Sequence, residues 1–449
     1  MSITNFNLIE TGKEFPNREI SLRNMRYRIQ ETRFSGRYND NSYLIVQSST
    51  GTQKKLPWKT LKINQFKLYV NKMDSLVFNR DPIIKSGNVQ RDKEIMDLVE
   101  RTEWVKTVRK AFRNLEIYGD SYIKTYKHGA SAFSPLHAFK VVDRSDKDKV
   151  KAYVLYENIV NDDNDITHIR FEVHLKGKVY ERVYVYNNQQ IGESVRYVYK
   201  GRTIGKGGNW YDTNVDEFMV QLLSIDTDQD GYGASPFEDF SSQVHELERR
   251  QTLESKILDS HSEPMLVLGV GCLVENEETG RVETIDVLGN ILEIPNGGQV
   301  PQYVTWDGKL DSNENMIDLL YNEIYQLSEL GKVYMTGEYG GNISEETLSN
   351  LMKSSIDKGN RHIWDMYYDI RKSLFVLCRL NDIDVKLEEL NIIFEVGQSE
   401  SVSKIADIIN SRVKEGTLSL ETALQKYEGL DKEQAKEEIE RIRKEKNNV

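Results

Sequence analysis

The sequence predicts a mixed α+β protein. Residues 121–225 contain short segments in which apolar and polar side chains alternate, as they do in strands with one solvated face. Residues 236–262, 311–330 and 344–380 instead form long predicted helices. At roughly 150 residues per domain, a chain of 449 residues corresponds to about three structural units or to one large body with insertions.

The first part of the chain predicts helices around a short β segment. Ser21–Glu31 is basic and helix-like, Tyr43–Gln47 resembles a strand, and Ile63–Phe78 has the apolar spacing of a helix that stops before Asp81-Pro82. A further helix is predicted over about 102–115. The predicted strands that follow are 121–126, 138–143, 151–157, 168–175, 179–187 and 217–225.

The character of the sequence changes at residue 236. Ser235, Pro236 and Glu238 stand at the N-cap, N1 and N3 positions of a predicted capping box, and a helix over 236–262 would be about 40 Å long. Its narrow apolar stripe contains Phe237, Phe240, Val244 and Leu247.

A compact β excursion is predicted over 264–308, and a second helix over about 311–331. A Gly-rich loop leads to Ser344, which is predicted to cap the longest helix, with Ile343 and Leu348 as a hydrophobic staple. A short strand at 392–396 and charged C-terminal helices complete the prediction.

Charge and composition exclude several classes of protein. The net charge is −11, but residues 1–72 carry +8 and the remainder −19, whereas a generic nucleic-acid binder has a global basic excess. The basic N-terminal part is either a solvated face or a DNA site. Cys272 and Cys378 form neither a disulfide framework nor a metal quartet, which favours a reducing cytoplasm.

Targeting segments are not expected. The longest nearly apolar run, 264–274, is about half the length of a membrane span, so no membrane association is predicted. The N-terminal residues lack the basic start and apolar stretch of a signal peptide.

Catalytic motifs are equally scarce. Asp226, Asp228 and Asp230 match the first half of an EF-hand loop, but position 12 is Phe237 instead of a bidentate Glu. The sequence contains no P-loop, H-E-x-x-H or G-x-S-x-G motif. We therefore predict a protein that is not an enzyme and that needs no cofactor or metal.

One enzymatic alternative stays open. It is a divalent-metal-dependent enzyme that would combine the 226–230 carboxylates with those of Asp162, Asp163 and Asp165. It predicts specific binding of a divalent ion and loss of activity in Asp228→Ala.

The order of the elements indicates an assembly. Two long, charged helices flank a small β insertion, and the second leads through a Gly-rich loop into a still longer helix. Their narrow apolar stripes are suited to packing against neighbouring copies, and a repeated head-to-tail interface closes into a ring.

In the order of its predicted elements and in the sequences of several short segments, the chain resembles the portal proteins of tailed bacteriophages, in their siphovirus-type form. The segments that carry the resemblance are NKMDSLVFNRDPIIKSG, FRNLEIYGDSYIK, DGYGASPFEDF, SEPMLVLG, the helix–loop–helix over 311–380, and KEGTLSLETALQKYEGLDKEQAKEEIERI.

The resemblance implies a portal fold with a wing, a two-helix stem, a small β clip, a long wing helix and a short helical crown. The implied regions are 1–235 (wing), 236–263 (first stem helix), 264–308 (clip), 309–331 (second stem helix), 332–343 (tunnel loop), 344–397 (long wing helix and strand) and 398–449 (crown).

The resemblance also implies function and partners. In the family, twelve copies form a ring at one capsid vertex, which conducts double-stranded DNA during packaging and ejection. The implied partners are the DNA, the other copies, the terminase large subunit, the major capsid and scaffolding proteins, and the head–tail connector. The implied location is the virion, and the host cytoplasm during assembly. A minor head or connector protein with the same helices and no DNA channel is a further alternative.

Two groups of residues become candidates for contacts. Those for the DNA-tunnel loop are Lys332, Val333, Tyr334, Met335, Glu338 and Tyr339. Those for the clip tip, which would meet the motor or connector, are Glu275, Glu277, Glu278 and Arg281. An ordinary flexible turn and a solvated hairpin turn, respectively, are the alternative interpretations.

Overall fold

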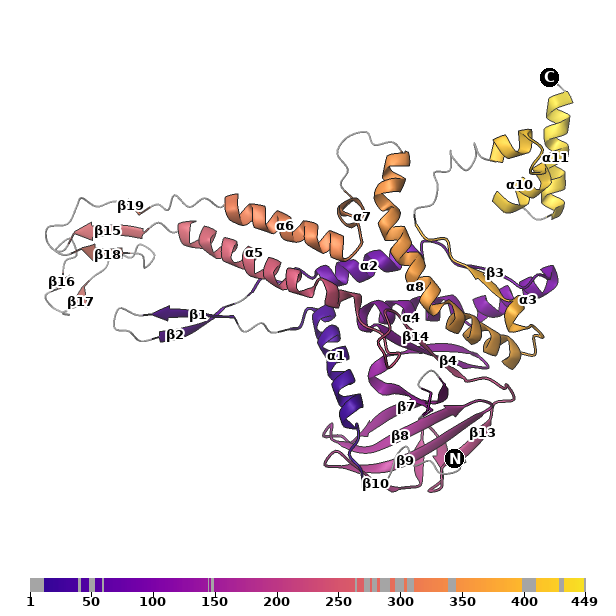
Figure 1. Ribbon diagram of the computed structural model, residues 1–449, viewed down its shortest axis with the longest axis horizontal. Coiled ribbons are helices and arrows are strands. Elements are labelled where there is room, and N and C mark those ends of the chain that lie inside the picture. The colour runs from indigo at the N-terminus through magenta and orange to yellow at the C-terminus, as the bar shows by residue number, and fades with distance from the viewer. Residues whose placement is uncertain are drawn as a thin grey trace. The chain divides into compact units, whose positions relative to one another are not determined.

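The chain folds into two units, Met1–Val396 and Gly397–Val449, shown in the computed structural model of Figure 1. The smaller unit contains α10 (Leu420–Tyr427) and α11 (Lys432–Asn447), which pack against each other. The described residues are 12–38, 42–47, 53–58, 60–143, 145–146, 149–262, 265–269, 275–276, 281–282, 291–294, 303–304, 311–337, 345–397, 409–427 and 432–447.

Helices and sheets share the larger unit, so the predicted α+β class is confirmed. Its helices are α1 (Arg18–Ser35), α2 (Gln65–Val77), α3 (Val89–Arg101), α4 (Trp104–Tyr118), α5 (Ser241–Ser262), α6 (Asp311–Leu327), α7 (Lys332–Thr336) and α8 (Glu345–Leu380). Helix α3 was not predicted. Its buried residues Ile95, Leu98 and Val99 stand at helical spacing among many charged ones, so the amphipathic pattern was present in the sequence and was missed.

The main sheet is an antiparallel meander with strand order β10-β9-β8-β7-β6, to which β13 is added beside β9. The strands are β6 (Ala138–Val142), β7 (Val150–Val160), β8 (Ile166–Leu175), β9 (Lys178–Asn187), β10 (Gln190–Ser194) and β13 (Asn209–Asp212). Phe15 packs edge-on against Tyr156 and Phe171 of this sheet, with ring centroids 5.0 and 4.9 Å away. The N-terminal segment thereby closes one apolar face.

A second sheet has the order β14-β4-β5. Its strands are β4 (Asp120–Tyr126), β5 (Gly129–Phe133) and β14 (Val220–Ser224). The smaller pairs are β1 (Ser42–Gln47) with β2 (Gln53–Trp58), β3 (Ile83–Lys85) with β20 (Asn391–Ile393), and β11 (Tyr197–Tyr199) with β12 (Arg202–Ile204). Short strands such as β3 and β5 were not predicted because three to five residues give little periodicity.

Helix α4 lies at the centre of the main core. Its fully buried Trp104, Val108, Phe112 and Leu115 belong to one apolar cluster that also includes residues of α2, α5, α6 and α8. Gly119 ends α4 at φ 84°, and a Cβ there would lie 2.5 Å from the backbone carbon of Ala234. A glycine is therefore required where α4 meets the segment that precedes α5.

The predicted continuous helix over 236–262 was wrong in its first turn. Pro236–Asp239 forms a 3-10 helix, and α5 begins only at Ser241. The predicted capping box does not form. Ser235 accepts a hydrogen bond from the Phe237 N–H, and Glu238 instead accepts one from Gln30 of α1 at 3.1 Å. A tertiary contact thus replaces the local cap.

Residues 264–308 are described only in their short strands. β15 (Met265–Gly269) pairs in parallel with β18 (Ile291–Ile294) and antiparallel with β19 (Tyr303–Val304). β16 (Glu275–Asn276) and β17 (Arg281–Val282) form a separate hairpin. The predicted β excursion is therefore present. The predicted cap and staple at 343–344 lie outside the described residues.

Candidate functional site: the paired helices and the α6–α7 junction

Helices α5 and α6 lie side by side and extend away from the main core (Figure 1). Val244 and Leu247 of α5, with Leu320 and Ile324 of α6, are buried in the main apolar cluster. Farther along the pair, Gln251 Nε2 donates to the Tyr321 hydroxyl at 3.2 Å. The pair is therefore apolar at its base and held by polar contacts farther out.

The surface of α6 is acidic. Its 17 residues include Asp311, Glu314, Asp318 and Glu323, and no Lys or Arg. Side chains that point away from the main cluster include Leu319, which is 49% exposed. An α-helix with this composition repels phosphate groups and still offers apolar contact area.

The charges of α5 are balanced locally. Glu246 accepts hydrogen bonds from Arg249 and Arg250, each 2.7 Å away through Nε. These guanidinium groups, Arg249 first, lower the pKa of Glu246 to about 2. Its carboxylate therefore stays ionised at any physiological pH.

The end of α6 is clamped by one face of α8. Lys358 Nζ donates to the Ser328 carbonyl oxygen at 3.1 Å, and Ser355 Oγ accepts from the Gly331 N–H at 3.2 Å. Arg361 Nη2 donates to Glu329 Oε1 at 2.6 Å. The three α8 residues are spaced at intervals of three and so share a helix face.

Lys358 is the buried charged residue of this clamp. Burial lowers its pKa, although nearby carboxylates, Glu116 first, oppose that shift. Its ammonium group meets the negative end of the α6 dipole, where a cation is favourable. The same group lies 5.2 Å from the Tyr69 ring centroid. The clamp therefore joins α2, α6 and α8.

Helix α7 occupies the start of the predicted tunnel loop, where irregular structure was expected. Tyr334 donates its hydroxyl to the Lys72 carbonyl at 2.8 Å, and Lys72 Nζ donates to the Tyr334 carbonyl at 2.9 Å. Burial raises the pKa of Tyr334 to about 12. The helix ends at Gly337, whose φ of 73° is the left-handed conformation that suits glycine.

The loop candidates therefore have different surroundings. Met335 is buried and Tyr334 is held against α2, whereas Lys332 is exposed and Val333 is half-buried. The remaining loop candidates, Glu338 and Tyr339, lie outside the described residues. Anchored α7 was missed because its partner Lys72 is some 260 positions earlier in the chain.

The clip-tip candidates are partly described. Glu275 and Arg281 stand on the paired strands β16 and β17, where Glu275 is opposite Val282 and Arg281 is opposite Asn276. The backbone register thus places both at one hairpin. Glu277 and Glu278 lie outside the described residues.

The acidic segment 226–230 forms a turn that the side chain of Asp228 stabilises. Asp228 Oδ1 accepts the N–H groups of Asp230 at 2.9 Å and Tyr232 at 3.0 Å. In the second acidic loop, Asn161 Oδ1 accepts the N–H groups of Asp163 and Asp165. Within the described ranges, no group of three or more His, Cys, Asp or Glu side chains is placed to hold a metal ion.

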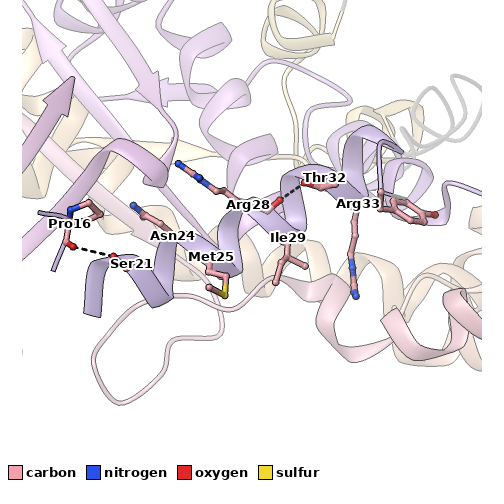
Figure 2. Close-up of a pocket in the computed structure, with 9 residues that line it drawn as sticks. Pro16, Ser21, Asn24, Met25, Arg28, Ile29, Thr32 and Arg33 are labelled. Carbon is pink, nitrogen blue, oxygen red and sulfur yellow. Dashed lines mark hydrogen bonds between the residues drawn. The ribbon is translucent and has the colours of Figure 1, made fainter. Parts of the chain in front are cut away.

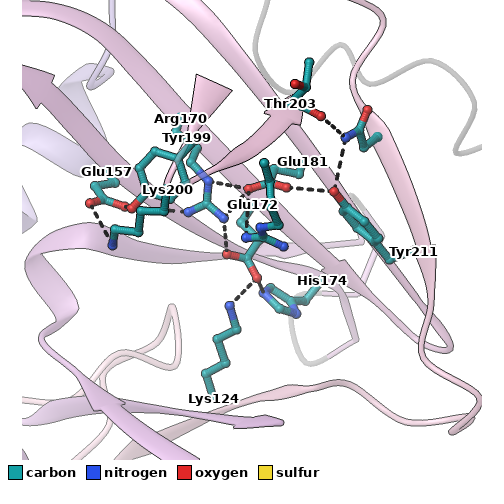
Figure 3. A network of polar contacts seen from close by, with 12 residues as sticks. Lys124, Glu157, Arg170, Glu172, His174, Glu181, Tyr199, Lys200, Thr203 and Tyr211 are labelled. Atoms are coloured by element: carbon teal, nitrogen blue, oxygen red, sulfur yellow. Dashed lines mark hydrogen bonds and ion pairs between the residues drawn. The ribbon is translucent and has the colours of Figure 1, made fainter. Parts of the chain in front are cut away.

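A buried network of charges lies between the two sheets (Figure 3). Glu172 of β8 is in contact with Lys124 of β4, with Arg170 at 2.9 Å and with His174 at 3.0 Å. Burial would raise the pKa of Glu172, but His174 and the two cations outweigh it and lower this pKa. Burial lowers the pKa of His174.

Within these described contacts, the network joins β4 to β8, which is the pattern of a structural tie, and it leaves the buried His174 Nδ1 without a hydrogen-bond partner. A comparable tie joins three helices, because the Glu116 carboxylate accepts the Tyr69 hydroxyl at 3.0 Å and faces His362 Nδ1 at 2.6 Å. No local sequence pattern indicates either tie, because the partners come from separate elements.

Residues 295–449 match the family described as phage portal protein, SPP1 Gp6-like. The match confirms the resemblance to phage portal proteins. It includes α6, α7 and α8, the helices that build the junction described above. This portal family is structural and not enzymatic, which agrees with the prediction that the chain is not an enzyme. The match to this family supports a portal role for the chain.

Solved structures were also compared with the chain. The neck of an empty gene transfer agent particle, computed with C6 symmetry, is 10% identical over 80% of this chain and 87% of that chain, with a TM-score of 0.40. The virion of the native gene transfer agent particle has the same identity and coverage and a TM-score of 0.39. No curated protein matches the chain. None of the described helices has the length and apolar character of a membrane span.

Proposed function

We propose that twelve copies of this chain form a ring at one capsid vertex and that double-stranded DNA passes through its channel during packaging and ejection. The observation that carries the proposal is the match of residues 295–449 to phage portal proteins. The chain would be located in the virion, after assembly in the host cytoplasm.

The proposal assigns a place in the ring to each region. Residues 1–235 would be the wing, 236–263 and 309–331 the stem, 264–308 the clip, 332–343 the tunnel loop, 344–397 the long wing helix and strand, and 398–449 the crown. The paired α5 and α6 support the stem assignment, because they are long, lie side by side in opposite directions and are joined by a β segment.

The charge of α6 supports a conducting role. Phosphates bound by many Lys and Arg side chains are held through counterion release, which would stall a sliding duplex. A 17-residue helix with four acidic residues and no basic one repels the duplex instead. DNA would therefore slide past the stem without being trapped.

The α7 region would contact the DNA through few groups. Lys332 is exposed at the start of α7, next to half-buried Val333, while Tyr334 and Met335 hold the helix against the body. Lys332, with Glu338 and Tyr339 beyond α7, would then approach the duplex. One cation per copy gives a ring of weak and replaceable phosphate contacts.

The clip hairpin would meet other proteins. Glu275 and Arg281 share one hairpin in the described register, and Glu277 and Glu278 stand between them in the sequence. We assign this tip to contacts with the terminase large subunit and then with the head–tail connector. The major capsid and scaffolding proteins would surround the wing.

The assembled mass and the passage of DNA test the proposal. Native mass spectrometry of the purified full chain should give a ring of about a dozen copies, and electron microscopy should reveal an axial channel. Rings seated in a solid-state nanopore should pass double-stranded DNA under voltage. Lys332→Glu should shorten the dwell time of the DNA, with Lys353→Glu on the exposed side of α8 as the charge-matched control.

Two results would overturn parts of the proposal. A chain that stays monomeric at high concentration, alone and with a scaffolding protein, would exclude the ring. A closed ring that blocks DNA in the nanopore would instead favour a connector or minor head protein without a DNA channel.

A further inference from the structure

Helix α1 buries a mixed side and exposes an apolar row. The side that faces the rest of the chain contains apolar Ile20 and Tyr27 together with polar Arg23, Asn24 and Gln30. The outer side carries Leu22, Met25 and Ile29, which are 54, 59 and 45% exposed. We name these three residues the outer α1 row. Buried polar and exposed apolar side chains on one helix are the informative deviation from ordinary burial.

The buried polar residues of α1 bind other elements of the chain. Asn24 Nδ2 donates to the Tyr156 hydroxyl at 2.9 Å, and Arg23 lies over the Tyr232 ring at 4.0 Å. The buried side of α1 is therefore used to bind the main sheet and the segment before α5. The outer α1 row has to find its partner outside these contacts.

An open groove of about 490 Å³ is lined by two residues of the outer α1 row (Figure 2). Met25 and Ile29 lie along it, and Arg28 and Arg33 stand beside them. The groove thus combines apolar side chains with guanidinium groups. Such a surface is suited to an acidic amphipathic helix, which lays an apolar row into a groove.

This chain itself contains a helix of that kind. The 18 residues of α1 include five Arg and two Glu, whereas α6 has four acidic residues and no basic one. On α6, Leu319 and Leu327 are 49 and 40% exposed, and a spacing of eight places them on one side of the helix. The two surfaces are complementary in charge and share exposed apolar rows.

In Figure 1, α1 and α6 lie on opposite sides of α5. Two different complementary surfaces on one subunit form a head-to-tail interface, and such an interface gives a ring when its rotation closes. We propose that the outer α1 row of one copy binds the side of α6 that carries Leu319 and Leu327, next to Asp318, on the neighbouring copy, while the other carboxylates of α6 stay free to face the channel. The inference rests on the proposed ring and adds which faces build it.

Charge reversal tests the pairing in the full chain. Arg28→Glu and Asp318→Lys should each raise the concentration needed for half-assembly at least tenfold, measured by analytical ultracentrifugation. The double variant Arg28→Glu/Asp318→Lys should return to within about threefold of the wild type. Lys110→Glu, an exposed charge on α4, is the matched control and should leave assembly unchanged.

Cross-linking tests the contact directly. In a Cys272→Ser background, chains with Met25→Cys are mixed with chains carrying Leu319→Cys and treated with a short bis-maleimide. Cys378 is buried and should not react. Mixed dimers should form, and the control Val198→Cys, at a similarly exposed apolar position, should give none.

The outcomes separate the two proposals. Wild-type rings, together with unaffected charge variants and no Met25–Leu319 cross-link, would overturn the α1–α6 contact and leave the ring intact. Cross-links between two Met25→Cys chains would also overturn it, because α1 would then bind α1. A wild-type chain that never assembles would overturn both.

Discussion

Helices α1 and α4 are of similar length and adjoin the same core, yet they place their large apolar residues differently. Helix α4 buries Trp104 and Phe112 completely, whereas α1 buries Tyr27 but leaves Met25 and Ile29 exposed. The difference separates a helix whose large apolar side chains are satisfied within its own chain from one that also keeps an exposed apolar row for a partner. Amphipathic spacing alone does not distinguish the two cases.

The largest expected loss of stability comes from a substitution in α4. Phe112→Ala should lower the free energy of unfolding by about 3–5 kcal/mol, because it removes a fully buried ring from the central cluster. Met25→Ala on α1 is the matched substitution and should change the stability of the isolated chain by no more than about 0.5 kcal/mol. Denaturant unfolding followed by circular dichroism measures both. Equal losses of unfolding free energy in the two variants would contradict this distinction between α4 and α1.

The next largest expected effect is at the clamp on α6. Lys358→Met should lower the free energy of unfolding by about 1–3 kcal/mol, because it leaves the buried Ser328 carbonyl without its hydrogen-bond donor. Amide hydrogen exchange should accelerate at the end of α6 and in α7. Lys353→Met, on the exposed side of the same helix, is the control and should change neither measurement. Unchanged exchange in Lys358→Met would mean that α6 is held without α8.

A pH titration of stability tests the network between the sheets. Burial keeps the folded-state pKa of His174 below its ordinary value of 6.5, so the neutral form favours the folded state. Its stabilisation is therefore present above pH 6.5 and is lost as the pH falls below that value. His174→Gln should remove up to about 1.4 kcal/mol per pH unit from the slope between pH 6.5 and 5.

The titration is measured by urea unfolding at closely spaced pH values. His128→Gln, a substitution at an exposed position before β5, is the control and should keep the wild-type slope. A wild-type slope in His174→Gln as well would show that this buried ring does not govern acid sensitivity.

The smallest expected effect is at α7. Tyr334→Phe should lower the free energy of unfolding by about 0.5–1.5 kcal/mol, since it removes the hydrogen bond to the Lys72 carbonyl. Faster amide hydrogen exchange confined to α7 would show that this helix is held in place by contacts within its own chain. Tyr368→Phe, at a half-exposed position on α8, should be neutral.

The strongly periodic elements were predictable from the sequence. The alternation over 168–175 and 179–187 predicted β8 and β9, and the apolar spacing over 63–78 predicted α2. Local patterns sufficed there because apolar side chains recur at the spacing of a strand or a helix. Helix α3 was missed although Ile95, Leu98 and Val99 stand at helical spacing among its charged residues.

The candidate site was only partly predictable. The order of helix, loop and helix located the α6–α8 junction, but not the bond from Lys358 to Ser328 or the anchoring of Tyr334 to Lys72. Both connect residues that are distant in sequence, and a Gly-rich segment with Gly331 and Gly337 resembled a free loop. Glu238 was misassigned for the same reason, because its partner Gln30 belongs to α1.

The clamp at the end of α6 also determines how the subunit would respond to force. Ser355, Lys358 and Arg361 contact three residues of the α6–α7 turn, Gly331, Ser328 and Glu329 respectively, over 3.2, 3.1 and 2.6 Å. A pull along α6 would load these bonds together, in shear, and not one after another as in unzipping. The junction would therefore transmit tension from the helix pair into α8 as a stiff joint, and yield only when all three bonds break within the same event.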